Sequence, residues 1–130
     1  MKKLTILLGI LIVALFVFIS PITSFVIENG LKNSDQHWAP ALVFGGARMK
    51  MRILQHEDAL KAFQEGIRHF PNYKQMPKIY FWVAFSYEKE DRIDMARQWY
   101  EKYLDKWPDH IWASQARNRL ARLEVAAGSD

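Results

Sequence analysis

An uncharged apolar run occupies the start of the chain. Residues 4–27 contain no Asp, Glu, Lys or Arg, and Lys2 and Lys3 come directly before them. As an α-helix this run would extend about 36 Å, which exceeds the hydrocarbon core of about 30 Å in a typical bilayer. The run also has no polar face, which argues against a core helix of a water-soluble domain. The pattern therefore predicts a membrane-spanning helix within residues 1–27.

Beyond the apolar run, hydrophobic positions recur at helical spacing. Ile79, Val83 and Tyr87 lie four residues apart, as on one face of an α-helix. A charged stretch at 88–92 interrupts them, and Pro108 ends the next hydrophobic pattern because proline cannot continue a helix. The chain shows no alternating strand pattern, so we expect an all-α fold. The periodicity predicts helices at about residues 41–53, 57–70, 79–87, 96–107 and 111–126.

The helical patterns repeat with a period of 37 residues. The tripeptide Phe-Pro-Asn at 70–72 returns as Trp-Pro-Asp at 107–109, and Trp-Ala at 38–39 returns two periods later at 112–113. Agreement at several positions predicts a repeat architecture in which each unit packs on its neighbours. Further matches at this offset are Ala59 with Ala96, Phe63 with Tyr100, Ile67 with Leu104, and Val83-Ala84 with Leu120-Ala121.

Each unit carries small and aromatic residues at fixed spacing, formed by Val43, Gly46, Ala47, Ala59, Phe63, Gly66 and Pro71 in the first unit, and by Tyr80, Val83, Ala84, Tyr87, Ala96, Tyr100 and Pro108 in the second. This skeleton resembles that of the tetratricopeptide repeat family, in the variant of bacterial envelope proteins. Lys50 and Tyr103 depart from the family pattern, as do the polar Arg117 and Glu124 of the closing helix. The resemblance implies that residues 38–126 form two helical hairpins and a capping helix.

The repeated positions also predict the core. The alanines are expected where helices approach closely, and the aromatic residues are expected to fill the spaces between hairpins. Close helix packing also explains the glycine pair at 45–46 better than a phosphate-binding loop, because no strand precedes it and no Lys-Ser or Lys-Thr follows it. The alanines and aromatic residues expected in the core are Ala47, Ala59, Ala84, Ala96, Ala121, Phe63, Tyr87, Tyr100 and Tyr103.

The apolar run predicts the domain organisation. The expected parts are a membrane anchor at 1–27, a linker at 28–37, a repeat domain at 38–126 and a tail at 127–130. The lysines before the run favour a cytoplasmic N-terminus, which places the domain outside the cytoplasm, in the periplasm of a Gram-negative cell. A cleaved secretory signal is the alternative. Its best cleavage site follows Ser24, but Ile22 fits that site poorly.

Composition narrows the possible functions. The net charge is +4, but from Glu28 onward the chain has 16 basic and 14 acidic residues. Because residues of both signs are interleaved, nucleic-acid binding is not expected. Cysteine is absent, which excludes disulfides and thiolate catalysis. The four histidines form no H-x-x-x-H or H-E-x-x-H pattern. We expect no enzyme activity, metal, cofactor or small-molecule substrate.

The resemblance implies a groove for a protein partner along the first helix of each hairpin. Aromatic anchors rimmed by cations suit a peptide or helix of acidic character. An alternative leaves Phe81 and Phe85 as contacts with the neighbouring helix. The positions carried over from the family are Phe44, Arg48, Met51, Arg52, Lys78, Phe81, Phe85, Lys89, Asn118 and Arg122, with Glu88 and Gln115 beside them.

These expectations combine into one functional hypothesis. The chain is expected to be an interaction scaffold or a small accessory subunit of a membrane-embedded complex in the bacterial inner membrane. Its partners would be subunits of that complex, and residues 4–27 would hold it in the bilayer. A secreted soluble adaptor after signal cleavage is one alternative. An enzyme whose site is completed by a partner is another.

Overall fold

The computed structural model describes residues 1–128, and in this part of the chain it contains α-helices and no strand. The all-α fold expected from the hydrophobic pattern is therefore confirmed, with each predicted helix displaced by only a few residues. The helices are α1 (Lys2–Lys32), α2 (Ala39–Arg52), α3 (His56–His69), α4 (Met76–Lys89), α5 (Ile93–Lys106) and α6 (Ala113–Gly128).

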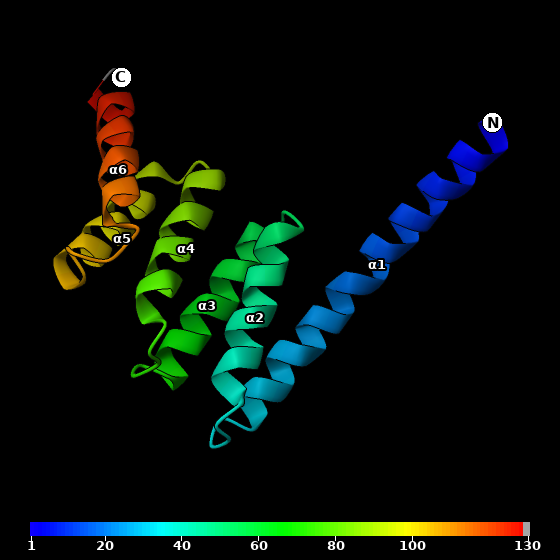
Figure 1. Ribbon diagram of the computed structural model, residues 1–130, viewed down its shortest axis with the longest axis horizontal. Helices are drawn as coiled ribbons and strands as arrows, with labels where there is room; N and C mark the ends of the chain where they lie inside the picture. Colours follow the sequence, from blue (N-terminus) through cyan, green and yellow to red (C-terminus); the bar gives the residue numbers. More distant parts are fainter. Residues whose placement is uncertain (129–130) are drawn as a thin grey trace.

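Helix α1 is a continuous rod whose first half projects away from the other helices (Figure 1). None of the residues in its most apolar stretch is buried, and the helix is long and apolar enough to cross a membrane. Pro21 lies inside the helix and does not end it. The hydroxyls of Thr23 and Ser24 both donate to the backbone oxygen of Ser20, which leaves that oxygen well satisfied next to the proline.

The second half of α1 packs against α2. Thr23, Ile27 and Gly30 are buried in this contact. The helices approach so closely that a Cβ atom on Gly30 would lie 2.7 Å from a methyl group of Val43. On Gly46 it would lie 2.5 Å from Cγ1 of Ile27. A larger residue at either position would therefore force neighbouring atoms of α1 or α2 to shift.

This contact changes the expected domain boundaries. The linker expected at residues 28–37 does not exist as such, because residues 28–32 continue α1 and only 33–38 connect it to α2. The expected tail at 127–130 also differs, because α6 extends to Gly128, and residues 129–130 lie outside the described part of the chain. The helical domain thus includes the end of the helix that was expected to serve only as its anchor.

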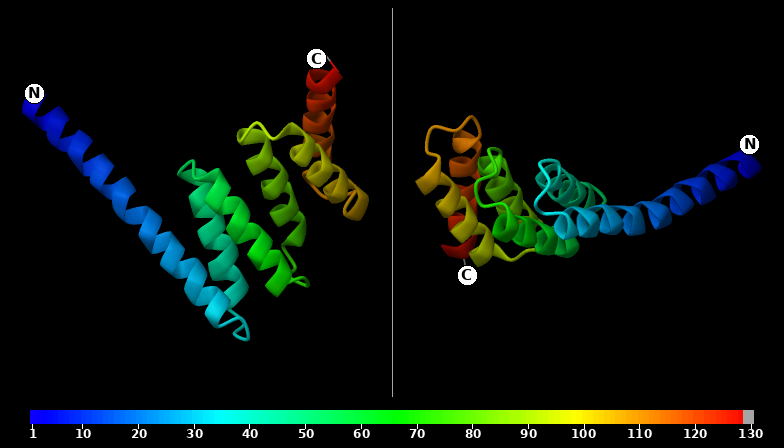
Figure 2. Two further views of the ribbon diagram at one scale, coloured as in Figure 1. Left: turned by 180° about the vertical axis from the view of Figure 1, so that it is seen from behind. Right: turned by 90° about the horizontal axis from the view of Figure 1, so that it is seen from below.

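The remaining helices form two antiparallel hairpins and a closing helix. Helix α2 pairs with α3, α4 pairs with α5, and α6 packs on α5. Viewed from below, α2 and α4 lie in one layer, and α3 and α5 lie in the other together with α1 (Figure 2, right).

The repeated small and aromatic residues form the core between these layers. Ala47, Ala59, Ala84 and Ala96 are fully buried. Ala121 is exposed, so its predicted role is wrong: it lies on the last helix, where no further unit covers it. The expected aromatic core is confirmed, since its members are all buried, namely Phe63, Tyr87, Tyr100 and Tyr103.

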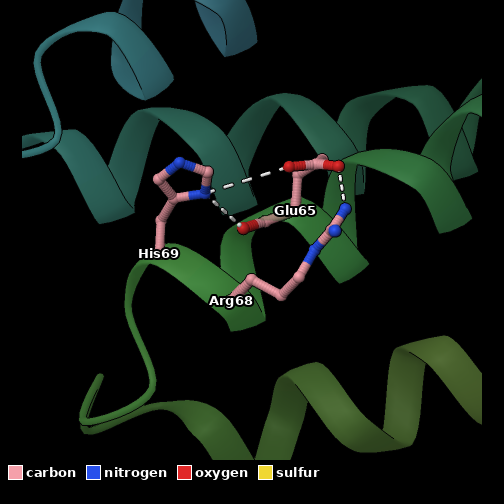
Figure 3. Close-up of polar contacts among 3 residues, drawn as sticks. All are labelled: Glu65, Arg68 and His69. Carbon is pink, nitrogen blue, oxygen red and sulfur yellow. Dashed lines mark hydrogen bonds and ion pairs between the residues drawn. The ribbon is translucent and has the colours of Figure 1, made fainter.

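The end of α3 shows how surface polar residues complete a helix. Arg68 and His69 lie in its last turn, where backbone carbonyls favour positive charge. The carboxylate of Glu65 accepts a hydrogen bond from Arg68, and its backbone oxygen lies 2.9 Å from Nδ1 of His69 (Figure 3). These exposed contacts add little to stability. In this structure His69 serves as a polar residue at the end of α3.

Candidate protein-binding surface

One face of α4 gathers cations and aromatic rings. Lys78, Trp82, Phe85 and Lys89 follow one another at spacings of four, three and four residues, so they lie along the same side of the helix. All four side chains are partly or fully exposed. Neighbouring residues from α2 and α6 extend this side. We call the set the cation–aromatic face, and its members are Arg48, Lys78, Trp82, Phe85, Lys89, Trp112 and Arg119.

The first part of this face joins α2 to α4 and to the start of α6. The guanidinium of Arg48 lies 4.6 Å from the ring centroid of Trp82. The ammonium of Lys78 lies 5.5 Å from the ring of Trp112, and the two tryptophan rings are 5.9 Å apart. A cation over an indole ring is attracted to the electron-rich face of that ring. These contacts hold both cations at the surface.

The second part lies one to two turns further along α4. The ring of Phe85 has the ammonium of Lys89 at 5.1 Å and the guanidinium of Arg119 at 4.9 Å. Arg119 donates to both carboxylate oxygens of Glu88 at 3.1 Å, and Tyr100 donates to the same carboxylate at 2.7 Å. Burial, reinforced by this bond to Glu88, raises the pKa of Tyr100, which keeps its hydroxyl protonated as a donor.

A hydrogen bond under the face helps to position Trp112. The hydroxyl of Tyr103 is bonded to Nδ1 of His110, in the connection just before Trp112. Desolvation, together with the nearby charge of Lys78, lowers the pKa of His110, which favours the neutral ring that can accept this bond. The neutral imidazole therefore supports the loop that carries the indole.

Two of the predicted groove residues are not available to a partner. Phe44 is only 3% exposed, and its ring stacks on Tyr73 with centroids 5.1 Å apart. A Cβ atom on Gly66 would lie 2.5 Å from the same ring, so α3 closes directly over it. The prediction that Phe44 faces a groove is therefore wrong.

Phe81 is the second of these residues. It is 6% exposed, and its ring contacts Tyr100, Tyr103 and Trp112 at centroid distances of 5.2–5.8 Å. The alternative that kept it as a contact with neighbouring helices is the one that the structure supports. Phe81 precedes Trp82 by one residue, and one residue turns a helix by about 100°, which carries the ring from the surface into the core.

The structure brings four predicted residues together on the cation–aromatic face: Arg48, Lys78, Phe85 and Lys89. Met51 is partly buried on α2 and Arg52 is exposed at the end of that helix. Asn118 and Arg122 are exposed on α6.

Three members of this face are not among the residues expected from the sequence, namely Trp82, Trp112 and Arg119. A signal for two of them was present. Trp82 and Arg119 are 37 residues apart and so occupy one repeat position, directly after the position shared by Phe81 and Asn118. Adding this repeat position to the expected set, beside the position shared by Arg48 and Phe85, includes both residues.

Comparisons with known proteins add no relative. No protein-family profile, curated protein or solved structure matches the chain.

Proposed function

We propose that this protein is a membrane-anchored interaction module of tetratricopeptide type. Its helical domain, outside the cytoplasm of a bacterial cell, binds a protein partner that belongs to a complex in the same inner membrane. The observation that carries this proposal is the cation–aromatic face at the surface of α2, α4 and α6. The proposal assigns no catalysis, cofactor or nucleic-acid binding to the chain.

The chemistry of this face favours an acidic partner. It holds four cations, at Arg48, Lys78, Lys89 and Arg119, and Glu88 is the carboxylate that pairs with one of them. Aromatic rings beside cations supply apolar contact and charge at one place, a combination enriched at binding hot spots. An amphipathic peptide or helix with carboxylates at its edge would match both features.

Retention of the anchor is supported by contacts between α1 and the α2–α3 hairpin. Lys50 is 4% exposed, and its ammonium lies 3.4 Å from the backbone oxygen of Ser20 and 3.3 Å from Oε1 of Gln55. Cleavage after Ser24 would remove Ser20 and the buried Thr23. A buried charge that loses a partner is costly, so the domain is better suited to an uncleaved α1 than to a secreted form.

The anchor has a direct test. Protein isolated from membranes of cells that express the full chain should have an intact mass that includes residues 1–24. It should also stay in the membrane during carbonate extraction, because a spanning helix is not released by alkaline washing. A mature protein that begins at Phe25 and is released by carbonate would support the secreted adaptor instead.

The binding face has an independent test. Reversing two of its charges, Arg48→Glu with Lys78→Glu, should weaken partner binding by about tenfold or more at low salt. Salt should reduce the difference, because it screens exposed charges. Affinity purification in mild detergent, at two salt concentrations, would measure it.

The matched control reverses two exposed cations in the other layer, Lys61→Glu with Lys102→Glu. It makes the same change in net charge, and partner recovery should remain at the wild-type level. Equal recovery from both double variants, with folding intact by circular dichroism, would remove the cation–aromatic face from consideration.

A further inference from the structure

The turns within the two hairpins each have a left-handed residue at the same position, but the second turn is charged and the first is mostly apolar. Leu54 and Asp91 are the non-glycine residues with positive φ in the described chain, at 65° and 58°, and they lie 37 positions apart. Aspartate tolerates this left-handed conformation, whereas a leucine there is unusual. The turn of the second hairpin reads Glu-Lys-Glu-Asp-Arg over residues 88–92, while the first reads Met-Arg-Ile-Leu-Gln over residues 51–55.

The unusual residue is also exposed. The side chain of Leu54 is 76% exposed, so it gains nothing from the core of its own chain. Exposure alone is ordinary for a single leucine, but the strained backbone conformation at this position makes a contact outside the chain worth considering.

The position of the first turn identifies the surroundings of this leucine. The hydroxyl of Ser20 donates to Oε1 of Gln55 at 3.0 Å, which fixes the turn against α1. Phe16, Val17 and Ser20 line a shallow pocket together with Gln55. The turn therefore lies beside α1 at the level where its apolar, unpacked half begins.

That level coincides with the end of a membrane span. Residues 4–20 number 17, at the lower end of the roughly 17–25 residues that cross a bilayer. After Ser20 one side of α1 packs on α2, where Thr23 and Ile27 are buried, while Ile22 and Phe25 on the other side stay exposed. The bilayer surface therefore falls near Ser20, next to the first turn.

One exposed cation lies beside the turn. Lys50 is buried and Arg48 lies over Trp82, so Arg52 is the basic residue available to headgroups, while the acidic Glu57 and Asp58 begin α3 after the turn. Arg52 is exposed two residues before Leu54. Interfacial membrane contacts combine an inserted apolar side chain with cations at the level of the phosphates.

We propose that the turn between α2 and α3 is a second membrane contact, in which Leu54 inserts among the lipids and Arg52 meets anionic headgroups. This inference depends on the proposed membrane anchor. It means that the domain lies directly on the bilayer surface and does not hang from it on a linker.

The experiment uses three single-cysteine variants of the full chain, which has no cysteine of its own. Leu54→Cys tests the turn, Asp91→Cys is the matched turn of the second hairpin, and Val13→Cys reports the anchor. Val13 is exposed on α1, and Asp91 is exposed as well. Each cysteine carries an environment-sensitive fluorophore, and the protein is reconstituted into phosphatidylethanolamine–phosphatidylglycerol vesicles.

Spin-labelled phospholipids should quench the probe at residue 54 at least about twofold more than the probe at residue 91, because interfacial insertion reaches about 5–10 Å into the bilayer. The probe at residue 54 should also be protected from aqueous iodide. Replacing Arg52 by glutamate should reduce the lipid quenching at residue 54, more so in vesicles that contain phosphatidylglycerol.

Three results would overturn the inference, and they differ from one another. Lipid quenching at residue 13 but not at residue 54 would leave the anchor intact and refute the second contact. Protection from iodide at residue 54 without lipid quenching would assign the turn to a protein contact. Absence of lipid quenching at residue 13 would refute the anchor, and the second contact with it.

Discussion

Replacement of Phe81 by alanine is expected to destabilise the domain by about 3–5 kcal/mol, the usual loss for a buried phenylalanine. The ring touches Tyr100, Tyr103 and Trp112, so its removal leaves a cavity between α4 and the helices beside it. Unfolding by urea in mild detergent would measure the change through tryptophan fluorescence. All five tryptophans lie at position 38 or beyond, so this signal reports the helical domain and not the apolar half of α1.

Phe85→Ala is the matched control, four residues along the same helix. Its ring is partly exposed and lies between Lys89 and Arg119. We expect a loss of about 1 kcal/mol, mainly from two cation–π contacts near the surface. This variant should weaken partner binding while the domain stays folded. Similar stability losses for Phe81→Ala and Phe85→Ala would contradict the assigned rotation of α4.

Gly46→Val is expected to have the second largest effect. The new side chain would meet Ile27 where a Cβ atom alone already comes within 2.5 Å of Cγ1, so α1 and α2 must move apart. Overpacking of this kind costs about 1–3 kcal/mol. The same urea measurement would show it.

The adjacent glycine provides the control. A Cβ atom on Gly45 meets nothing within 4 Å, so Gly45→Val changes the helix alone. Valine is a slightly better helix residue than glycine, and stability should stay the same or rise by up to about 0.5 kcal/mol. If both substitutions behave alike, the end of α1 does not pack on α2 as described.

The period of 37 residues predicted the architecture well, because it reflects packing that every unit must satisfy. Small residues at Ala59, Ala84 and Ala96 allow helices to meet closely, and the structure buries all three. Ala121 shows the limit of this reasoning. It continues the pattern on the last helix, where nothing follows to cover it.

The candidate surface was harder to predict, because a helix changes its exposed side within one residue. Phe81 and Trp82 are both large and aromatic, and only the position of α5 and α6 decides which one is buried. The composition of the chain contains no such information. The expected cations were recovered more easily, because the side chains of Arg48 and Lys89 reach the surface from their helices.

The end of the first helix could not be predicted from the sequence for a related reason. Residues 28–32 are mostly polar, and without a partner helix they look like the start of a linker. Their helical state depends on contact with α2, where Gly30 allows the backbones to approach. A glycine in a polar stretch indicates a flexible connection as readily as a close contact, so the pattern alone did not distinguish them.

Helix α1 is continuous from its apolar half into the packed domain, so the two parts move together. Helices that cross a bilayer are tilted from its normal by about 20° on average. In the proposed membrane-anchored form, α1 enters the helical domain without a flexible joint, so any such tilt would swing the whole domain and redirect Trp82 and its neighbours. The membrane itself would then set the angle at which this protein meets its partner.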